Sequence, residues 1–411
     1  MEWVACVGID WADQKHDYAL RGREGERRCG TFSSSPEDVH GWVEGLRVQY
    51  PVGTIVVAME QSRGSLLYAL SIYDFLVLVP INPRAASSYR DSLHLSGAKD
   101  DPVDAGLICD FAATHLEKLR VWRADDAATR KLRLLVEYRR TLVEQRTSFK
   151  QALIAILKQY FPQALTWFGN NSALLGAFVA VWPTLERAQQ ARADRIRTVI
   201  RSCSRMSAER VASTLAAIRV ARPLTTDAAI IAALALRVES TVAIVRQLDE
   251  QIERHDRAID DAWAAHADRE LFASFPGAGP ILAPRLAAAF GSDRSRFTAA
   301  DEMQNYSGTS PVTVRSGKRC SVHARWQRPT FLHQTFHEFA EASIPHCSWA
   351  RAFYQHQRER GAGHRMAIRA LAFRWIRVLY TCWKENTPYV DARYLDALKR
   401  RGSPVAARLA A

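Results

Sequence analysis

The chain has 411 residues, of which 48% are hydrophobic and 24% charged, and its formal net charge is +13. This composition is typical of a globular protein and excludes a disordered or collagen-like chain. No basic segment followed by a long apolar one opens the sequence, and the longest uncharged stretch, 161–185, is interrupted by Pro and Gly. We therefore expect neither a secretory signal nor a membrane partner. Seven scattered cysteines without a CxxC pair indicate reduced thiols and a cytoplasmic location.

The charge is distributed unevenly. Residues 1–125 contain 13 basic and 18 acidic side chains, residues 126–270 contain 22 and 16, and residues 271–411 contain 21 and 9. An acidic first third joined to a strongly basic last third indicates that one part binds cations and another binds a polyanion. An arginine bias from a GC-rich genome is the plain alternative.

The first 125 residues alternate short apolar runs with amphipathic segments, which is typical of an α/β domain with a mixed sheet. Turn-like residues around Gly22–Gly25 predict an antiparallel meander, and Ser33–Ser35 supply N-cap hydroxyls for the first helix. We expect strands at 4–9, 18–21, 27–32, 54–59 and 75–79, and helices at 36–49, 65–73 and 102–113.

From Asp126 the period becomes helical. Apolar residues between Leu132 and Tyr160, and again between Val238 and Trp263, recur at close to heptad spacing. This pattern predicts two long helices over 126–270 that form an antiparallel or intermolecular coiled coil, a dimerisation device. A bundle packed within one chain is nearly as well supported by the same pattern.

The last third is expected to be an all-helical domain over 271–388, followed by a loosely structured tail, 389–411. A Gly-x-Gly turn at Gly277 and Gly279 lets backbone N–H groups approach a phosphate, although it also fits a simple turn. The segment 306–319 is rich in hydroxyl and basic side chains. Four tryptophans among arginines could stack on nucleobases or pack in a core. His333 and His337 fit a role as phosphate contacts or core residues better than a role as zinc ligands.

Four carboxylates stand where an α/β sheet would bring them together. Asp10 and Glu60 each follow a predicted strand, and Asp101 and Asp104 begin a predicted helix. Acids held this close are tolerated only when a divalent cation neutralises them. Oxygen ligands select Mg²⁺ or Mn²⁺, which supports two-metal phosphoryl transfer. Helix capping or an ordinary strand-end acid is the alternative for each residue taken singly.

The motifs, in this order, resemble those of insertion-sequence 110 family transposases of the 1111 group, over residues 3 to 390. The family pairs an N-terminal RuvC-like (RNase H-like) domain with a C-terminal transposase domain, and its DEDD acids fall on Asp10, Glu60, Asp101 and Asp104. Asp100 replaces the usual Thr and is an alternative to Asp101. The motifs are 8–16 (GIDWADQKH), 57–60 (VAME), 99–105 (KDDPVDA), 275–280 (FPGAGP), 306–311 (YSGTSP), 315–318 (RSGK) and 360–364 (RGAGH).

The resemblance also implies a serine nucleophile in the hydroxyl-rich loop. Ser316 of Arg315-Ser-Gly-Lys318 is the expected residue, and Ser310 is the alternative because this loop is shorter than the usual one. Cations must hold the scissile phosphate, and Arg315, Lys318 and Arg319 are the candidates.

These features together predict the transposase of a bacterial mobile element that cuts and rejoins donor and target DNA. The resemblance further implies a structured non-coding guide RNA, self-association into dimers and then a tetramer, and active sites composed of two chains. A RuvC-like Holliday-junction endonuclease using metal-activated water is the runner-up. A non-catalytic binder leaves the order of the acids unexplained.

Overall fold

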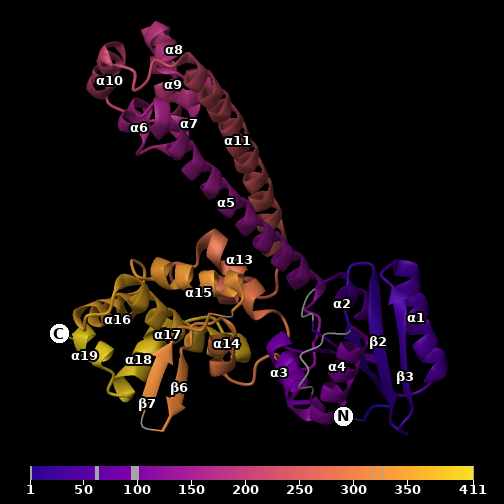
Figure 1. The fold of residues 1–411 in the computed structure, drawn as a ribbon. Coiled ribbons are helices and arrows are strands. Elements are labelled where there is room, and N and C mark those ends of the chain that lie inside the picture. Colours follow the sequence, from indigo (N-terminus) through magenta and orange to yellow (C-terminus); the bar gives the residue numbers. More distant parts are fainter. Residues whose placement is uncertain (1, 61–63, 94–100, 318, 327, 411) are drawn as a thin grey trace. The chain divides into compact units, whose positions relative to one another are not determined.

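The structure, a computed structural model, describes residues 2–60, 64–93, 101–317, 319–326 and 328–410, apart from the side chains of Leu93, Asp101, Pro102 and Ala410. The chain divides into two compact units, Met1–Asp125 and Asp126–Ala411 (Figure 1). The architecture is a mixed five-stranded sheet with helices, followed by helices and one hairpin, which confirms the predicted fold class.

The sheet of the first unit has the strand order β3-β2-β1-β4-β5. The first three strands form the predicted antiparallel meander, whereas β1, β4 and β5 run parallel. The strands are β1 (Ala5–Asp10), β2 (Lys15–Gly22), β3 (Arg27–Ser33), β4 (Ile55–Met59) and β5 (Leu76–Pro80). Both faces of β1 and β4 are buried, which explains their unbroken apolar runs.

Helices cover both faces of this sheet. Alternate residues of β1 and β4 pack either with α1 and α2 or with α3 and α4, because successive strand residues point to opposite faces. The helices are α1 (Pro36–Gln49), α2 (Ser65–Leu70), α3 (Pro83–Leu93), α4 (Asp101–His115) and the 3₁₀ helix η1 (Leu116–Lys118). Ser35 caps α1 by accepting a hydrogen bond from the Asp38 N–H at 3.2 Å. The sequence had not suggested α3.

Two long helices, α5 (Ala127–Tyr160) and α11 (Ala228–Ala264), pack against one another within one chain. They are antiparallel, since Arg139 pairs with Asp256 and Arg146 with Asp249. Each step of seven residues forward on α5 is thus matched by seven backward on α11, as in a heptad seam. The segment that connects α5 to α11 folds into a small helical subdomain, whose core includes the end of α5 and part of α11. Its helices are α6 (Gln163–Phe168), α7 (Ser172–Val181), α8 (Leu185–Gln190), α9 (Ala193–Cys203) and α10 (Ala208–Val220).

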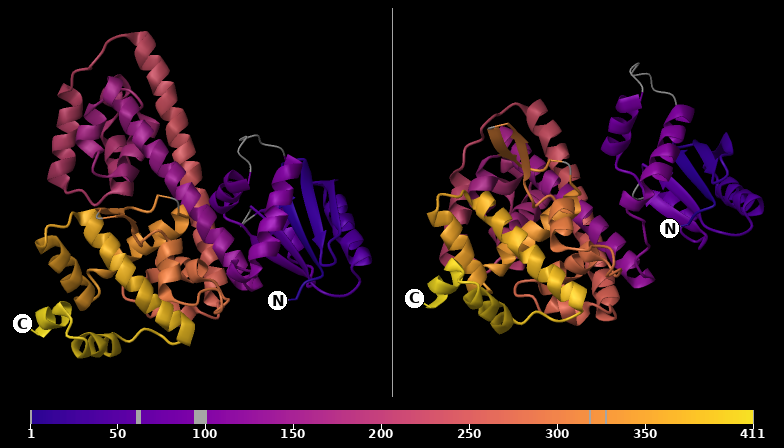
Figure 2. Two further views of the ribbon diagram at one scale, coloured as in Figure 1. Left: turned by 60° about the horizontal axis from the view of Figure 1, so that its bottom comes forward. Right: turned by 90° about the horizontal axis from the view of Figure 1, so that it is seen from below.

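Among the described residues, α11 is the one helix long and apolar enough to span a membrane by length and composition. Core helices of soluble proteins pass the same test. This helix packs on α5 and α7, as Figures 1 and 2 show.

The rest of the second unit is a helical domain with one β-hairpin. Its helices are α12 (Arg269–Ala273), α13 (Gly279–Phe290), α14 (Ala300–Tyr306), α15 (Thr330–Ser343), α16 (Ser348–Glu359), α17 (His364–Glu385), α18 (Asp391–Arg400) and α19 (Pro404–Ala410), and the hairpin joins β6 (Val312–Ser316) to β7 (Arg319–His323). Buried Arg285 of α13 binds Glu338 of α15 at 2.5 Å, and Arg140 of α5 binds the same carboxylate at 2.9 Å. This shared acid joins the long helices to the domain.

The C-terminal segment corrects one expectation. Residues 389–411 were expected to be loosely structured, but α18 and α19 occupy most of that segment. Leu398 and Val405 are both 2% exposed and belong to the main core of the domain. Burial of these two side chains stabilises two short helices that would be marginal on their own.

Candidate active site

The site in the first unit begins at the carboxyl ends of β1 and β4. These neighbouring strands are parallel, and Ile9 is paired with Met59. The next residue along each strand is Asp10 and Glu60, and both are partly exposed. Parallel pairing therefore brings the two acids to the same edge of the sheet, at adjacent positions.

Helix α4 brings the second pair of acids toward the same edge. It packs closely on β1, because a Cβ on Gly8 would lie 2.3 Å from the Ala105 carbonyl oxygen. The Cys6 and Cys109 thiols each lie within hydrogen-bond reach of the other's carbonyl. Since Cys109 lies over the start of β1 and Ala105 over Gly8, the N-terminus of α4 points toward Asp10.

Asp104 lies in the first turns of α4 and is 3% exposed. Arg90 of α3 forms an ion pair with its carboxylate at 2.7 Å. A buried carboxylate needs such a partner, because burial without one costs several kcal/mol. Asp101 begins the same helix, but its side chain and the alternative Asp100 lie outside the described residues.

A buried histidine orders the loop that follows Asp10. His16 of β2 is 2% exposed, its Nδ1 accepts a hydrogen bond from the Ala12 N–H at 3.4 Å, and its Nε2 lies 3.3 Å from Ser34 Oγ. Burial lowers the pKa of His16, so the ring is neutral near pH 7. Neither His16 nor Arg90 was predicted as a functional residue. The histidine in the motif after Asp10 was the available signal.

The donor set suits a hard divalent cation. Asp10, Glu60 and Asp104 offer only carboxylate oxygens, which Mg²⁺ and Mn²⁺ prefer. Within the described side chains, no group of three or more acidic, His or Cys residues is already close enough to hold a metal. Asp10 and Glu60 thus share one sheet edge, and the described side chains form no assembled ligand cage.

The predicted serine lies at the end of a hairpin in the second unit. Ser316 is the last residue of β6, and every residue of β7 is exposed. Gly317 follows with φ +55°, a left-handed conformation that favours glycine. The hairpin therefore presents a hydroxyl to solvent instead of burying it in a preformed pocket.

The hairpin register separates the predicted phosphate-binding residues. Ser316 is paired with Arg319, whereas Arg315 is paired with Cys320. Because paired residues share a face and neighbours alternate, Arg319 lies on the face of Ser316 and Arg315 on the other. Lys318 lies outside the described residues.

The alternative serine occupies a different setting. Ser310 ends a turn in which its N–H donates to the Gln304 carbonyl at 3.1 Å. Thr309, just before it, is buried, and its carbonyl accepts from Arg369 at 3.2 Å. This turn anchors the start of the hairpin to α14 and α17.

The two glycines of the Gly-x-Gly turn have different surroundings. Gly277 has φ +80°, and a Cβ there would lie 2.4 Å from the Ala342 carbonyl oxygen of α15. Gly279 has φ +55°, and its added Cβ would meet nothing within 4 Å. Close helix packing explains the glycine at 277, while the N-terminus of α13 is exposed at 279.

The tryptophans and histidines that the sequence analysis singled out differ in their surroundings. Trp349, Trp375 and Trp383 are fully buried in the core, whereas Trp326 is 82% exposed. The His333 and His337 rings lie 3.9 Å apart on α15. Burial, with the neighbouring ring and nearby arginines, lowers the pKa of His333 to about 4.

A mixed sheet with acids after two adjacent parallel strands, followed by a mostly helical region, is the architecture of a RuvC-like transposase. Family comparisons agree with this class. Residues 7–162 match the family model of insertion-sequence 110 DEDD transposases, and residues 269–355 match that of the transposase IS116/IS110/IS902 family.

The chain belongs to this IS110 family of transposases. It is 30% identical over 410 residues to the mini-circle putative transposase for IS117 of Streptomyces coelicolor, covering 95% of this chain and 96% of that protein. It is 27% identical to the IS116 44.8 kDa protein of Streptomyces clavuligerus, with 94% and 96% covered. The IS900 42 kDa protein of Mycobacterium paratuberculosis is 27% identical, with 83% and 85% covered. Membership implies an enzyme that cleaves and transfers DNA, and DEDD transposases typically use a divalent metal.

Proposed function

We propose that this transposase exchanges DNA strands by combining a Mg²⁺-dependent acid site with a serine nucleophile. The observation that carries the proposal is the pairing of β1 with β4, which brings Asp10 and Glu60 to one sheet edge. Asp104 and Asp101 complete the proposed ligand set from α4.

In this proposal, bound Mg²⁺ would neutralise the phosphate charge and polarise the scissile bond. Asp10, Glu60, Asp101 and Asp104 would hold it, and the ion pair with Arg90 would orient the Asp104 carboxylate until then. His16, neutral and hydrogen-bonded, would fix the loop after Asp10. These groups supply positioning, which can account for several kcal/mol of a barrier.

Ser316 Oγ would attack the scissile phosphorus, and the leaving strand would depart as a 3′- or 5′-hydroxyl after protonation. The product of this step is a phosphodiester between the protein and one DNA end. Attack by the hydroxyl of another strand would then release Ser316 and join the DNA. Arg319, on the face of Ser316, is the better placed cation for the phosphate, and Arg315 would contact the neighbouring backbone.

We further propose a structured guide RNA and self-association into dimers and a tetramer with composite active sites. The excess of basic residues in 271–411, 21 against 9 acidic, supports a polyanionic partner. Exposed Ile230 and Leu236 on α11 support self-association along the long helices. A protein that recognises folded RNA retains binding at raised salt, because contacts to the RNA shape and its 2′-hydroxyls add to the electrostatic attraction.

The decisive experiment is trapping of the serine adduct. Wild-type protein with Mg²⁺ and a nicked DNA substrate should give a denaturant-resistant protein–DNA band, and Ser316→Ala should abolish the band and recombination. Ser310→Ala is the matched control and should retain both. Normal recombination by both serine variants would reject the serine mechanism and favour the junction endonuclease.

RNA guidance is tested by competition at raised salt. RNA from the non-coding flank of the element should compete better than scrambled RNA of equal length. Equal competition would leave a transposase that recognises DNA alone.

A further inference from the structure

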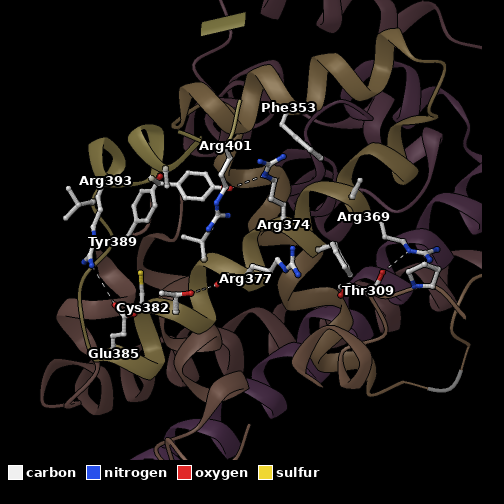
Figure 3. Close-up of a pocket in the computed structure, with 18 of the residues that line it drawn as sticks. Thr309, Phe353, Arg369, Arg374, Arg377, Cys382, Glu385, Tyr389, Arg393 and Arg401 are labelled. Atoms are coloured by element: carbon white, nitrogen blue, oxygen red, sulfur yellow. Dashed lines mark hydrogen bonds and ion pairs between the residues drawn. The ribbon is translucent and has the colours of Figure 1, made fainter. Parts of the chain in front are cut away.

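The C-terminal domain contains a groove that the proposed chemistry does not use. It has a volume of about 980 Å³ and is formed by α17, α18, the segment between them and the base of the β6–β7 hairpin. Figure 3 shows arginine side chains along this groove, with aromatic rings between them.

The charge of the groove is strongly one-sided. Among the described residues that line it, Glu385 is the single acid, and it lies 4.0 Å from Arg393. Five arginines line it: Arg369, Arg374, Arg377, Arg393 and Arg401. Arg377 and Arg401 are exposed. An occupant must therefore carry several negative charges.

Between the arginines, the lining is apolar and aromatic. Met366 and Val390 are 65% and 55% exposed, and Phe373 and Tyr389 are partly exposed. A duplex presents phosphates outward and keeps its bases stacked, so it cannot cover this surface. An unpaired strand presents both phosphates and base faces, and it therefore matches an arginine-rimmed apolar groove.

The wall of the groove is held rigid before any ligand binds. Tyr389 stacks on Phe275 at 5.2 Å, and its hydroxyl donates to Asp391 at 2.7 Å. Arg374 lies over the Phe353 ring and donates to the Tyr394 hydroxyl at 3.0 Å. Side chains fixed in this way lose little conformational entropy when they bind.

The groove also adjoins the serine hairpin. Val322 and His323 of β7 line it, as does Pro311 just before β6. His323 is paired with Val312, and Ser316 is four residues further along β6. Four strand residues span about 13 Å, so a strand leaving the groove at the hairpin base lies within a few nucleotides of Ser316.

We propose that this groove binds the unpaired DNA strand next to the phosphate that Ser316 attacks. Phosphates contact Arg377 and Arg401, and bases pack on Tyr389 and the apolar floor. The proposal rests on the proposed function for the choice of DNA. Binding alone is measured in its test, so its failure is separate from failure of the chemistry.

The test uses the full chain with Ser316→Ala in the presence of EDTA, so that no cleavage occurs. Fluorescence anisotropy with a 12-nucleotide single-stranded DNA at 0.15 M salt compares Arg377→Glu/Arg401→Glu with Arg358→Glu/Arg400→Glu. The control changes the net charge equally and does not alter the lining, and Arg400, the last residue of α18, directly precedes Arg401. We expect affinity to fall at least 10-fold in the groove variant and less than 3-fold in the control.

A second measurement locates the strand. Photocrosslinking of 5-iododeoxyuridine in the same oligonucleotide should modify Tyr389 or Phe373, as identified by mass spectrometry. Equal loss of affinity in both variants, crosslinks confined to other elements, or tighter binding of RNA of the same sequence would each overturn the proposal. The proposal would also be overturned if an acidic peptide of equal charge displaced the labelled DNA and excess unlabelled DNA did not.

Discussion

The sheet edge of the first unit and the serine hairpin of the second differ in how tightly the surrounding structure constrains them. The acids follow central strands whose residues are almost entirely buried, and α4 is packed so closely on β1 that only glycine fits at position 8. Ser316 is the last residue of β6, at the turn of a two-stranded hairpin that is almost wholly exposed. A two-stranded ribbon alone is marginally stable. In the proposed mechanism, the folded core positions the metal ligands Asp10 and Glu60, whereas bound DNA or another chain must fix the nucleophile Ser316.

The largest effect is expected from the acids. Asp10→Asn should reduce strand cleavage by about 1000-fold or more, because losing a metal ligand misplaces the scissile phosphate. Exposed Asp13→Asn, in the same loop, is the matched control and should cleave normally. Cleavage kinetics at saturating Mg²⁺ provide the measurement. Loss of activity in both variants would mean that the charge of the loop matters rather than ligation by Asp10.

Two equivalent glycine substitutions test the comparison directly. Gly8→Ala forces a Cβ into the backbone of α4 and should destabilise the first unit by about 2–3 kcal/mol. Gly317→Ala meets no neighbouring atom but strains a residue at φ +55°, about 1 kcal/mol confined to the hairpin.

Urea denaturation and hydrogen exchange in α4 should thus respond to Gly8→Ala alone. Recombination should fall about 10-fold in Gly317→Ala, whose unfolding curve stays unchanged. If Gly317→Ala recombines at the wild-type rate, the conformation of the hairpin does not control the nucleophile.

A smaller effect concerns pH. Burial lowers the pKa of His16 and of His337, and lowers that of His333 to about 4. Because the unfolded chain binds these protons more readily, their contribution to stability is complete above about pH 6.5 and is lost as pH falls toward 4. For His333 the loss is on the order of 1–2 kcal/mol, allowing for partial solvent exposure. Urea denaturation between pH 7 and 4 should show a flatter profile for His333→Gln, and an identical profile would contradict the shift.

The smallest effect belongs to the long helices. Arg146 and Asp249 lie 2.9 Å apart, with side chains 29% and 42% exposed. A double-mutant cycle with alanine should give a coupling of about 0.2–1 kcal/mol, which declines with salt because the pair is solvated. A coupling above about 2 kcal/mol would show that this pair, rather than the apolar seam, holds α5 against α11.

Local patterns in the sequence were enough to predict most elements of the first unit. Unbroken apolar runs predicted β1, β4 and β5, and the serines before Pro36 predicted the start of α1, because burial on both faces and capping are local requirements. The positions of Asp10 and Glu60 after their strands could be predicted in the same way. The sequence analysis missed α18 and α19, because helices of 10 and 7 residues depend on burial of Leu398 and Val405 in a distant core. Only the tertiary structure revealed the pairing of β1 with β4, the ion pair between Asp104 and Arg90, and the arginine groove. Each of these three features brings together residues from different elements, and such contacts leave no local pattern in the sequence.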